Sequence, residues 1–251
     1  MNPPRIFTLG SGTYPSDASL SVRTVPQVVE EVLARLDEVL PRHASWLAES
    51  LRPPVTETDL EALRSAVAPY DLPPEVVTML RWHDGQAEEA WWPSFLGYLP
   101  FDRAEWLARH HTARRSLYLD DVDDGNPFPP NLLPLTWHSW SLYCLELSND
   151  VTRGVVDATL DSDLSIVLPS LAALLEATAD LAEAGLITNH VDIDAWPNFY
   201  KRAVPIVQAT CERHSAGSWA FEGWTRGDSW PTLSRSGDAW PSHWTRDAIF
   251  P

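Results

Sequence analysis

Apolar residues recur every three or four positions early in the chain, a spacing typical of helices that bury one face. The clearest case lies between residues 26 and 40. Its apolar positions are Val28, Val29, Val32, Leu33, Leu36 and Leu40. Pro41 is expected to stop or kink this helix because proline lacks a backbone N–H donor. A second amphipathic segment follows Thr56, which together with Asp59 resembles a helix-capping sequence. The pattern therefore predicts two core-facing helices near the start of the chain.

The stretch Leu72–Gln86, LPPEVVTMLRWHDGQ, predicts a third helix. Pro74 suits a first helical position, and Gly85 suits the left-handed residue that often ends a helix. His83 is expected in the last turn, with Asp84 near the cap. A His beside an Asp is also compatible with proton transfer, so a hydrolase using this pair is an alternative. We interpret the pair as structural, because the surrounding pattern already explains it as a helix end.

Strand and helix patterns alternate in blocks through the middle of the chain. They predict a strand at 95–101, a helix from 102 to about 115, strands at 132–137, 141–147 and 154–160, and a helix at 170–184. Runs of like elements favour an α+β fold over strict α/β alternation. We therefore expect an antiparallel sheet packed against N-terminal helices and a following helix.

The two ends of the chain lack such clear patterns. Residues 1–25 are rich in Pro, Gly and Ser and are expected to form an irregular lead-in to a domain at 26–185. Residues 186–251 are expected to add a helix and a Trp-rich extension that packs on that domain. Its five tryptophans are Trp219, Trp224, Trp230, Trp240 and Trp244. An exposed ligand-binding or sugar-stacking role for them is the alternative.

Charge changes this picture more than any other bulk property. The 251 residues carry a formal net charge of -17, which argues against binding nucleic acid and favours a cationic partner. Residues 139–194 hold ten carboxylates and one cation, Arg153, so a negative face is expected. No apolar run approaches the roughly 18 residues of a membrane span, and a cytoplasmic, non-membrane protein is expected. In that reducing compartment Cys144 and Cys211 are expected to be buried thiols.

Motifs for the common catalytic and cofactor chemistries are absent from the sequence. His110 and His111 are adjacent on a predicted helix, where neighbouring side chains diverge, so a solvated helix face is expected. An acidic loop begins at Asp120, but calcium-loop positions three and twelve fall on Val122 and Asn131, which do not suit that site. We therefore expect no enzymatic activity, no cofactor and no metal.

The acidic positions are instead candidates for binding a partner. The predicted partner-binding residues are Asp120, Asp121, Asp123, Asp124, Glu146, Asp157, Asp161 and Asp163. Closely spaced carboxylates repel one another and can dock Lys or Arg of a protein partner. A merely solvated loop and a nonstandard cation site are the alternatives for the first four.

Several of these motifs, taken in order, resemble the SUKH superfamily, which includes bacterial immunity proteins and fungal cell-wall assembly regulators. The resemblance covers roughly residues 26–185. It rests on Thr56, Leu60, Leu72, Pro73, Leu80, His83, Asp84 and Gly85, followed by the aromatic FLGYLPF and by NLLPLTWHSWSLYCLEL. Trp82 is expected to belong to the same structural motif. Glu146 stands where the family more usually has Asp, and the Trp-rich extension has no assigned counterpart. The resemblance implies an α+β binding fold in which the His-Asp-Gly group is structural.

Together these inferences predict a non-enzymatic binding protein. The leading hypothesis is a bacterial immunity protein that neutralises a cationic toxin, such as a nuclease, by occlusion. The alternative is a housekeeping regulatory or scaffold protein that binds an endogenous protein partner. The sequence does not determine the partner or the oligomeric state.

Overall fold

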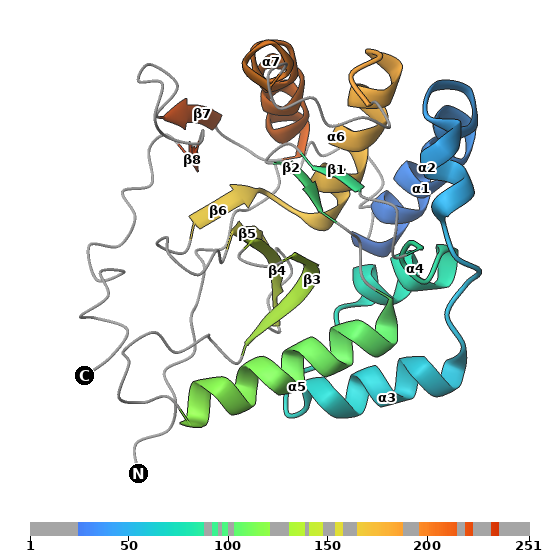
Figure 1. The fold of residues 1–251 in the computed structure, drawn as a ribbon, viewed down its shortest axis with the longest axis vertical. Coiled ribbons are helices and arrows are strands. Elements are labelled where there is room, and N and C mark those ends of the chain that lie inside the picture. The colour runs from blue at the N-terminus through green and yellow to red at the C-terminus, as the bar shows by residue number, and fades with distance from the viewer. Residues whose placement is uncertain are drawn as a thin grey trace, which may run out of the picture.

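The computed structural model describes residues 25–87, 92–94, 97–99, 103–120, 131–138, 141–147, 154–157, 165–187, 196–214, 219–222 and 232–235. Within them, helices surround a small antiparallel sheet, so the predicted α+β class is confirmed (Figure 1). The helices are α1 (Val25–His43), α2 (Ser45–Ser50), α3 (Glu57–Val67), α4 (Pro74–Trp82), α5 (Ala104–Asp120), α6 (Leu171–Glu183) and α7 (Trp196–His214). The acidic loop after Asp120 and most of the Trp-rich extension lie outside the described residues.

The first helix is longer than its apolar pattern predicts. α1 continues past Pro41 to His43, so of the expected stop or kink at the proline, the stop is wrong. A proline this close to a helix C-terminus removes the hydrogen bond of only one of the last residues, which the final turn tolerates. The chain then turns through Ala44 into the short helix α2.

Helix α3, the second helix that the sequence predicts, begins with the expected cap. The Thr56 side chain accepts a hydrogen bond from the Asp59 backbone N–H at 3.2 Å, which satisfies a donor left free at the helix start. The Thr56 hydroxyl also donates to the Asp59 carboxylate at 2.6 Å. Leu60, Leu63 and Val67 form the buried stripe of this helix. A local signal in the sequence is therefore sufficient to place this helix start.

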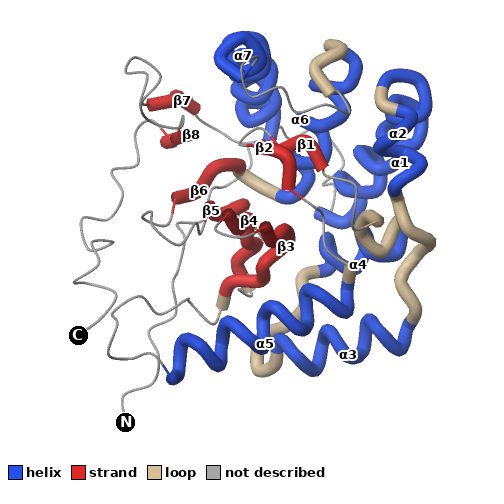
Figure 2. The backbone as a smooth tube through the Cα atoms, viewed as in Figure 1, coloured by secondary structure: helices blue, strands red, loops and turns tan. Residues whose placement is uncertain are grey.

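The main sheet has the strand order β3-β4-β5-β6, with every neighbouring pair antiparallel. Its strands are β3 (Leu132–His138), β4 (Ser141–Glu146), β5 (Val155–Asp157) and β6 (Ser165–Leu168). The first three match predicted strands, although residues 158–160 of the third lie outside the described residues, and β6 was not predicted. β3 and β4 pair from His138 with Ser141 to Leu132 with Glu146. Figure 2 shows this sheet among the surrounding helices.

Smaller hairpins accompany the main sheet. The aromatic segment predicted as one strand contains β2 (Gly97–Leu99), which pairs with β1 (Trp92–Ser94). In the C-terminal extension, β7 (Trp219–Glu222) pairs with β8 (Thr232–Arg235). β8 contacts the sheet edge formed by β6, while α5 contacts β3 at the opposite edge.

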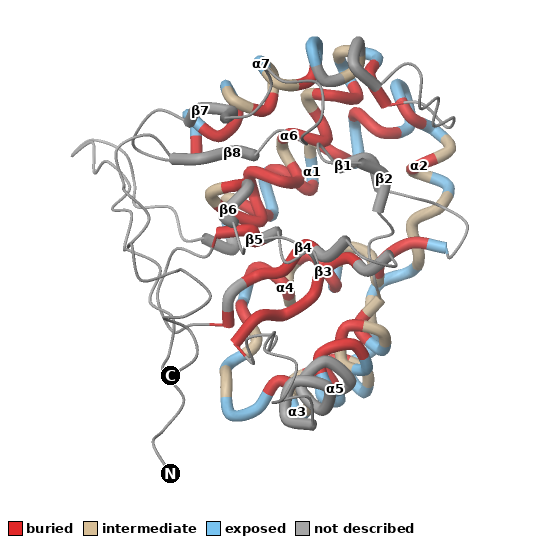
Figure 3. The backbone as a smooth tube through the Cα atoms, turned by 60° about the vertical axis from the view of Figure 1, so that its left-hand side comes forward, coloured by how far each residue is buried: buried red, intermediate tan, exposed pale blue. Residues whose placement is uncertain are grey.

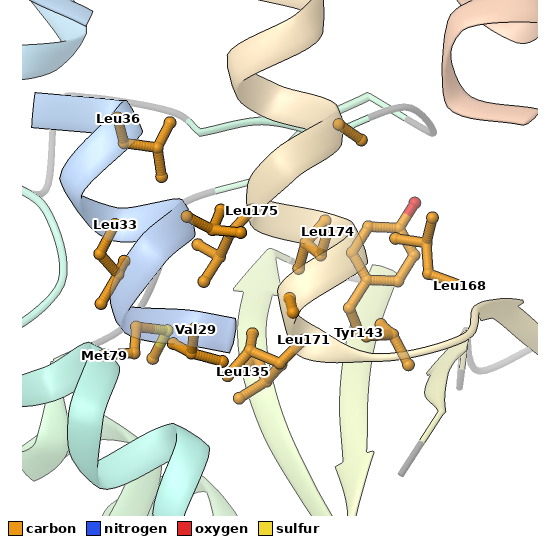
Figure 4. Packing of buried hydrophobic residues seen from close by; sticks show 14 of the residues in the cluster. Val29, Leu33, Leu36, Met79, Leu135, Tyr143, Leu168, Leu171, Leu174 and Leu175 are labelled. Atoms are coloured by element: carbon orange, nitrogen blue, oxygen red, sulfur yellow. The ribbon is translucent and has the colours of Figure 1, made fainter. Parts of the chain in front are cut away.

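The core lies where α1, α4, α6 and the sheet meet. Figure 4 shows Leu36 of α1 and Leu175 of α6 between the two helices, with Tyr143 of the sheet beside Leu174. Helix α6 buries nearly its whole circumference, because α1 packs on one side and α7 on another. A helix that is apolar on all sides is typical of the interior of a protein. Figure 3 shows the buried residues running through α6 and the sheet.

Both ends of α6 agree with the sequence prediction. The Ser170 side chain accepts a hydrogen bond from the Ala173 N–H at 3.1 Å and caps the helix start. Gly185 has a positive φ of 65°, and the Leu186 N–H that follows donates to the Leu181 carbonyl at 2.9 Å. This is the glycine-terminated helix end expected at this position.

The histidine pair on α5 is placed differently from the prediction. His110 and His111 are both buried, so the expected solvated helix face is wrong. α5 packs against α3 and against β3, and the side of the helix that carries the pair is enclosed. The His110 ring also meets Trp106 edge-on, with ring centroids 5.4 Å apart. Local spacing alone could not reveal this enclosure.

Candidate functional site

The stretch Leu72–Gln86 forms α4 and the turn that follows it. α4 starts at Pro74 and ends at Trp82, so His83 is the C-terminal cap in an extended conformation and not part of the last turn. The His83 N–H still donates to the Met79 carbonyl at 3.0 Å, whereas the Asp84 N–H donates to the Pro53 carbonyl at 3.1 Å. The helix therefore ends earlier than predicted because the backbone after His83 pairs with the segment before α3. Gly85 does have the expected positive φ, at 68°.

This backbone pairing joins residues 50–53 to residues 84–87. The Arg52 N–H donates to the Gly85 carbonyl at 3.1 Å, and the Ala87 N–H donates to the Ser50 carbonyl at 2.9 Å. The Gln86 side-chain amide adds a hydrogen bond to the Ser50 hydroxyl at 3.1 Å. Because buried backbone groups need partners, this short ladder holds the turn in one conformation.

The His83 imidazole adds a side-chain contact to this ladder between residues 50–53 and 84–87. Its Nδ1 hydrogen-bonds the backbone carbonyl of Arg52. A carbonyl oxygen only accepts, so Nδ1 carries the proton in this contact. The ring also meets Trp82 edge-on at 4.4 Å between centroids. Trp82 in turn donates its indole N–H to the Asp37 carboxylate of α1 at 2.8 Å.

Asp84 acts on a different element. Its Oδ1 accepts a hydrogen bond at 2.7 Å from the backbone N–H of Ala104, the first residue of α5. Burial raises the pKa of the Asp84 carboxyl, while this N–H and the nearby Arg52 oppose the rise. Asp84 therefore supplies a cap for α5 from the preceding turn. No local spacing rule relates two residues this far apart.

The space beside His83 is small. A cavity of about 10 Å³ lies between α4, α6 and the ladder of residues 50–53 and 84–87. It is lined by Leu51, Met79, Trp82, His83, Gly85, Gln86 and Leu175. A volume of this size corresponds to roughly one water molecule. The alternative of a hydrolase based on His83 and Asp84 requires an open cleft, whereas the pocket that the described residues form beside His83 is only of this size.

A second cluster of ionisable side chains joins α1, α6 and α7. Glu176 and Asp180 of α6 lie at its centre. Arg213 of α7 contacts both carboxylates, at 2.8 Å and 2.5 Å, and Arg35 of α1 contacts Asp180 at 2.7 Å. The buried His214 places its Nε2 2.5 Å from Glu176. We call these five residues the α6 charge cluster.

The charges in this cluster shift one another's protonation. Hydrogen bonding to His214 is the main cause that lowers the pKa of Glu176 to about 2, against the opposing effect of burial. Burial works against the charge of Arg213, but its hydrogen bonds to Asp180 and Glu176 outweigh it and raise the guanidinium pKa. Glu176 and Arg213 are therefore charged around neutral pH. Its groups are mutually satisfied, as in a structural ion-pair network.

This cluster corrects the expected charge of residues 139–194. Glu176, Asp180 and Glu183 were counted toward a negative face, but each carboxylate contacts an arginine of another helix. The two arginines, which lie more than thirty positions away in sequence, offset most of this negative charge. The remaining negative character of this region has to come from its other carboxylates.

Most predicted partner-binding residues fall outside what the structure describes. This applies to Asp121, Asp123, Asp124, Asp161 and Asp163. For Asp120, Glu146 and Asp157 only the backbone is described. Asp120 is the last residue of α5, Glu146 pairs with Leu132, and Asp157 pairs with Tyr143. A shared binding surface for these residues stays a prediction.

Exposed carboxylates do occur on the described surface. Glu30 and Glu38 of α1 and Glu49 of α2 are exposed and form no ion pair with the described cations. Spacing along the chain does not identify them, because only a structure shows which polar side of an amphipathic helix stays in water. Exposed carboxylates are therefore present outside the predicted loop.

The remaining candidate groups have structural surroundings. Cys144 and Cys211 are buried thiols, as expected, and burial raises the pKa of Cys211 to about 12. Among the residues that the structure describes, no three His, Cys, Asp or Glu side chains gather as a metal site requires. Within the same ranges, no helix has both the length and the apolar character needed to cross a bilayer.

Comparison with models of known protein families and with curated proteins gave no match to this chain. The resemblance to the SUKH superfamily therefore stays a prediction based on the order of short motifs.

Proposed function

We propose that this chain is a non-enzymatic, SUKH-like binding protein that neutralises a basic protein by covering its surface. Its partner would be a cationic bacterial toxin, such as a nuclease. The observation that carries this proposal is the net charge of -17. Surplus negative charge at a protein surface attracts a basic partner and repels nucleic acid.

The geometry of the His-Asp-Gly group supports a binding protein more than an enzyme. His83 and Asp84 each hold a separate piece of backbone, and the adjoining cavity is of water size. Neither side chain then has the open surroundings that a general base needs. In the proposed function these residues stabilise the fold, and surface carboxylates carry the recognition.

Occlusion follows from ordinary association physics. Complementary charge speeds the encounter with a basic surface, and close contacts then slow dissociation. A carboxylate surface placed over a nuclease active site would also occupy the cations that the nuclease uses for phosphate. Inhibition then requires no chemical step.

Co-expression with the product of the adjacent gene tests the function. We expect the two proteins to co-purify, and we expect cells that produce the neighbouring protein to survive only when this chain is present. Absence of both a complex and rescue would reject the immunity proposal. A complex without any toxicity of the partner alone would favour the regulatory or scaffold alternative.

Charge-reversal variants test where binding occurs. The triple variant Asp121→Lys, Asp123→Lys and Asp124→Lys is expected to weaken the complex at least about tenfold, because it places cations opposite a basic surface. The triple variant Glu30→Lys, Glu38→Lys and Glu49→Lys changes the net charge equally and is the control. Equal losses in both would show that net charge matters and that the loop is not a specific site.

A further inference from the structure

An open groove lies between the end of α3 and the start of α4. Its volume is about 740 Å³, and it is lined by Arg64, Ala68, Pro69, Tyr70, Asp71, Leu72 and Pro74. This volume falls within the range of roughly 300–1,000 Å³ that is usual for small ligands or side chains of a partner. Figure 2 shows the loop that carries most of these residues, where α3 leads into α4 beside α5.

Tyr70 lines this groove and is held in place by contacts with the core. Its side chain is half-buried and packs against the main core, so one side of the residue is anchored by apolar contacts. Its backbone N–H donates to the Val67 carbonyl at 3.1 Å, which ties the loop to the end of α3. A tyrosine held in this way offers an aromatic surface without a large loss of side-chain entropy on binding.

The charges around the groove favour a cationic occupant. Asp71 is exposed, and its carboxylate forms no ion pair with any described residue. Arg64 is the cation in the lining, and it is already engaged with Glu61 at 3.2 Å and Glu57 at 3.9 Å. The groove therefore presents an available carboxylate beside an aromatic ring, while its own cation is neutralised.

We propose that this groove receives an arginine side chain of the basic partner. The inference rests on the proposed function and adds a specific contact to it. A planar guanidinium can stack on the Tyr70 ring and pair with the Asp71 carboxylate in the same pose, which the compact ammonium of lysine does less well. The prolines and Leu72 would cover the aliphatic part of the arginine.

Nuclear magnetic resonance titration of the full chain with N-acetyl-arginine amide tests the groove. We expect saturable shifts of the amide signals of Tyr70, Asp71 and Leu72. We expect Asp71→Asn to weaken binding about fivefold, since it removes the charge pair at a solvated site. Glu38→Gln removes one exposed carboxylate of α1 and is expected to change binding less than twofold.

Tyr70→Leu keeps an apolar side chain in the wall but removes the aromatic ring, and it is expected to weaken binding to a similar extent. Circular dichroism monitors whether this partly buried substitution alters the fold. Asp71 is exposed, so Asp71→Asn still decides the outcome if Tyr70→Leu unfolds. Shifts that spread over all acidic surfaces, an absence of saturation, or equal effects of Asp71→Asn and Glu38→Gln would overturn the proposal.

The same variants against the co-expressed partner separate this inference from the proposed function. A native complex that Asp71→Asn weakens at least fivefold supports both. A native complex that Asp71→Asn weakens less than twofold rejects the groove as the contact and leaves the function standing. If the native chain forms no complex, the proposed function fails, and the titration alone decides whether the groove binds arginine.

Discussion

His83 and Asp84 are neighbours in the chain, yet each side chain serves a different segment. The imidazole binds the backbone of Arg52, and the carboxylate binds the first N–H of α5. A His-Asp sequence can indicate an acid-base pair, but here the backbone direction separates the two groups. At the scale of single residues, the pair joins the end of α4 to the segment before α3 and to the start of α5 through side-chain hydrogen bonds.

Replacing Asp84 tests its capping role. Asp84→Ala removes the acceptor for the Ala104 N–H and is expected to lower the free energy of unfolding by about 1–2 kcal/mol. Asp84→Asn keeps a side-chain oxygen and is expected to cost less than about 0.5 kcal/mol. Urea denaturation of the native protein and both variants measures these differences. Equal losses would show that the charge, and not the hydrogen bond, stabilises α5.

At the scale of elements, α6 is held by contacts of two kinds. Its apolar residues pack against α1 and the sheet, and its carboxylates face arginines of α1 and α7. Ala203, Val207 and Cys211 of α7 are fully buried against this part of the core. The α6 charge cluster therefore fixes the relative position of helices that also share apolar contacts. Ion pairs of this kind add orientation more reliably than they add stability.

Acid should weaken this arrangement in a defined direction. The pKa of Glu176 is about 2 in the folded protein, compared with 4.5 for an ordinary glutamate. Folding therefore favours the ionised form. The resulting stability is present above about pH 4.5 and is lost as the pH falls toward 2. The total loss from this group is at most about 3 kcal/mol.

Urea denaturation at several pH values checks this dependence. We expect Glu176→Gln to be less stable than the native protein at pH 7 and to show a shallower fall in unfolding free energy below pH 4.5. Glu212→Gln changes an exposed carboxylate of α7 and should keep the native slope. Parallel curves for native protein and Glu176→Gln would contradict the assignment.

At the scale of the whole molecule, the core runs from α1 through the sheet to α7. The SUKH-like part of the chain was expected to end near residue 185, with the rest packing onto it. Those boundaries stay a prediction, but α7 contributes fully buried residues to the core. Removing α7 would expose the side of α6 that it covers.

Two truncations measure the contribution of α7. A chain that ends after Ile187 is expected to have a free energy of unfolding at least about 3 kcal/mol lower than that of the full chain. It loses the apolar contacts of α7 and the two α7 partners of Glu176. A chain ending after His214 keeps α7 and is expected to lose less. Urea midpoints, with the dispersion of amide signals as a check on folding, compare the three proteins. Equal stability of both truncated chains would show that α7 contributes little.

The sequence by itself determined several of the local elements and the fold class. The Thr56 cap, the Ser170 cap and the Gly185 helix end act through groups a few residues apart, so their signals are readable in order along the chain. The block order of helices and strands then predicted α+β correctly. The expected helix stop at Pro41 was wrong, because the free-energy cost of a proline depends on how near it lies to the helix end. Apolar spacing does not reveal that distance.

Only the tertiary structure decided which distant groups meet. Asp84 caps α5, Arg213 and Arg35 neutralise carboxylates of α6, and the His110–His111 pair lies between packed elements. Each of these contacts joins separate helices, strands or turns, and its geometry depends on how those elements pack. The open groove beside Tyr70 arises in the same way, from the angle at which α3 leads into α4. Hydrogen bonds and charge pairs are short-ranged, so their partners follow from three-dimensional proximity and cannot be read from spacing along the chain.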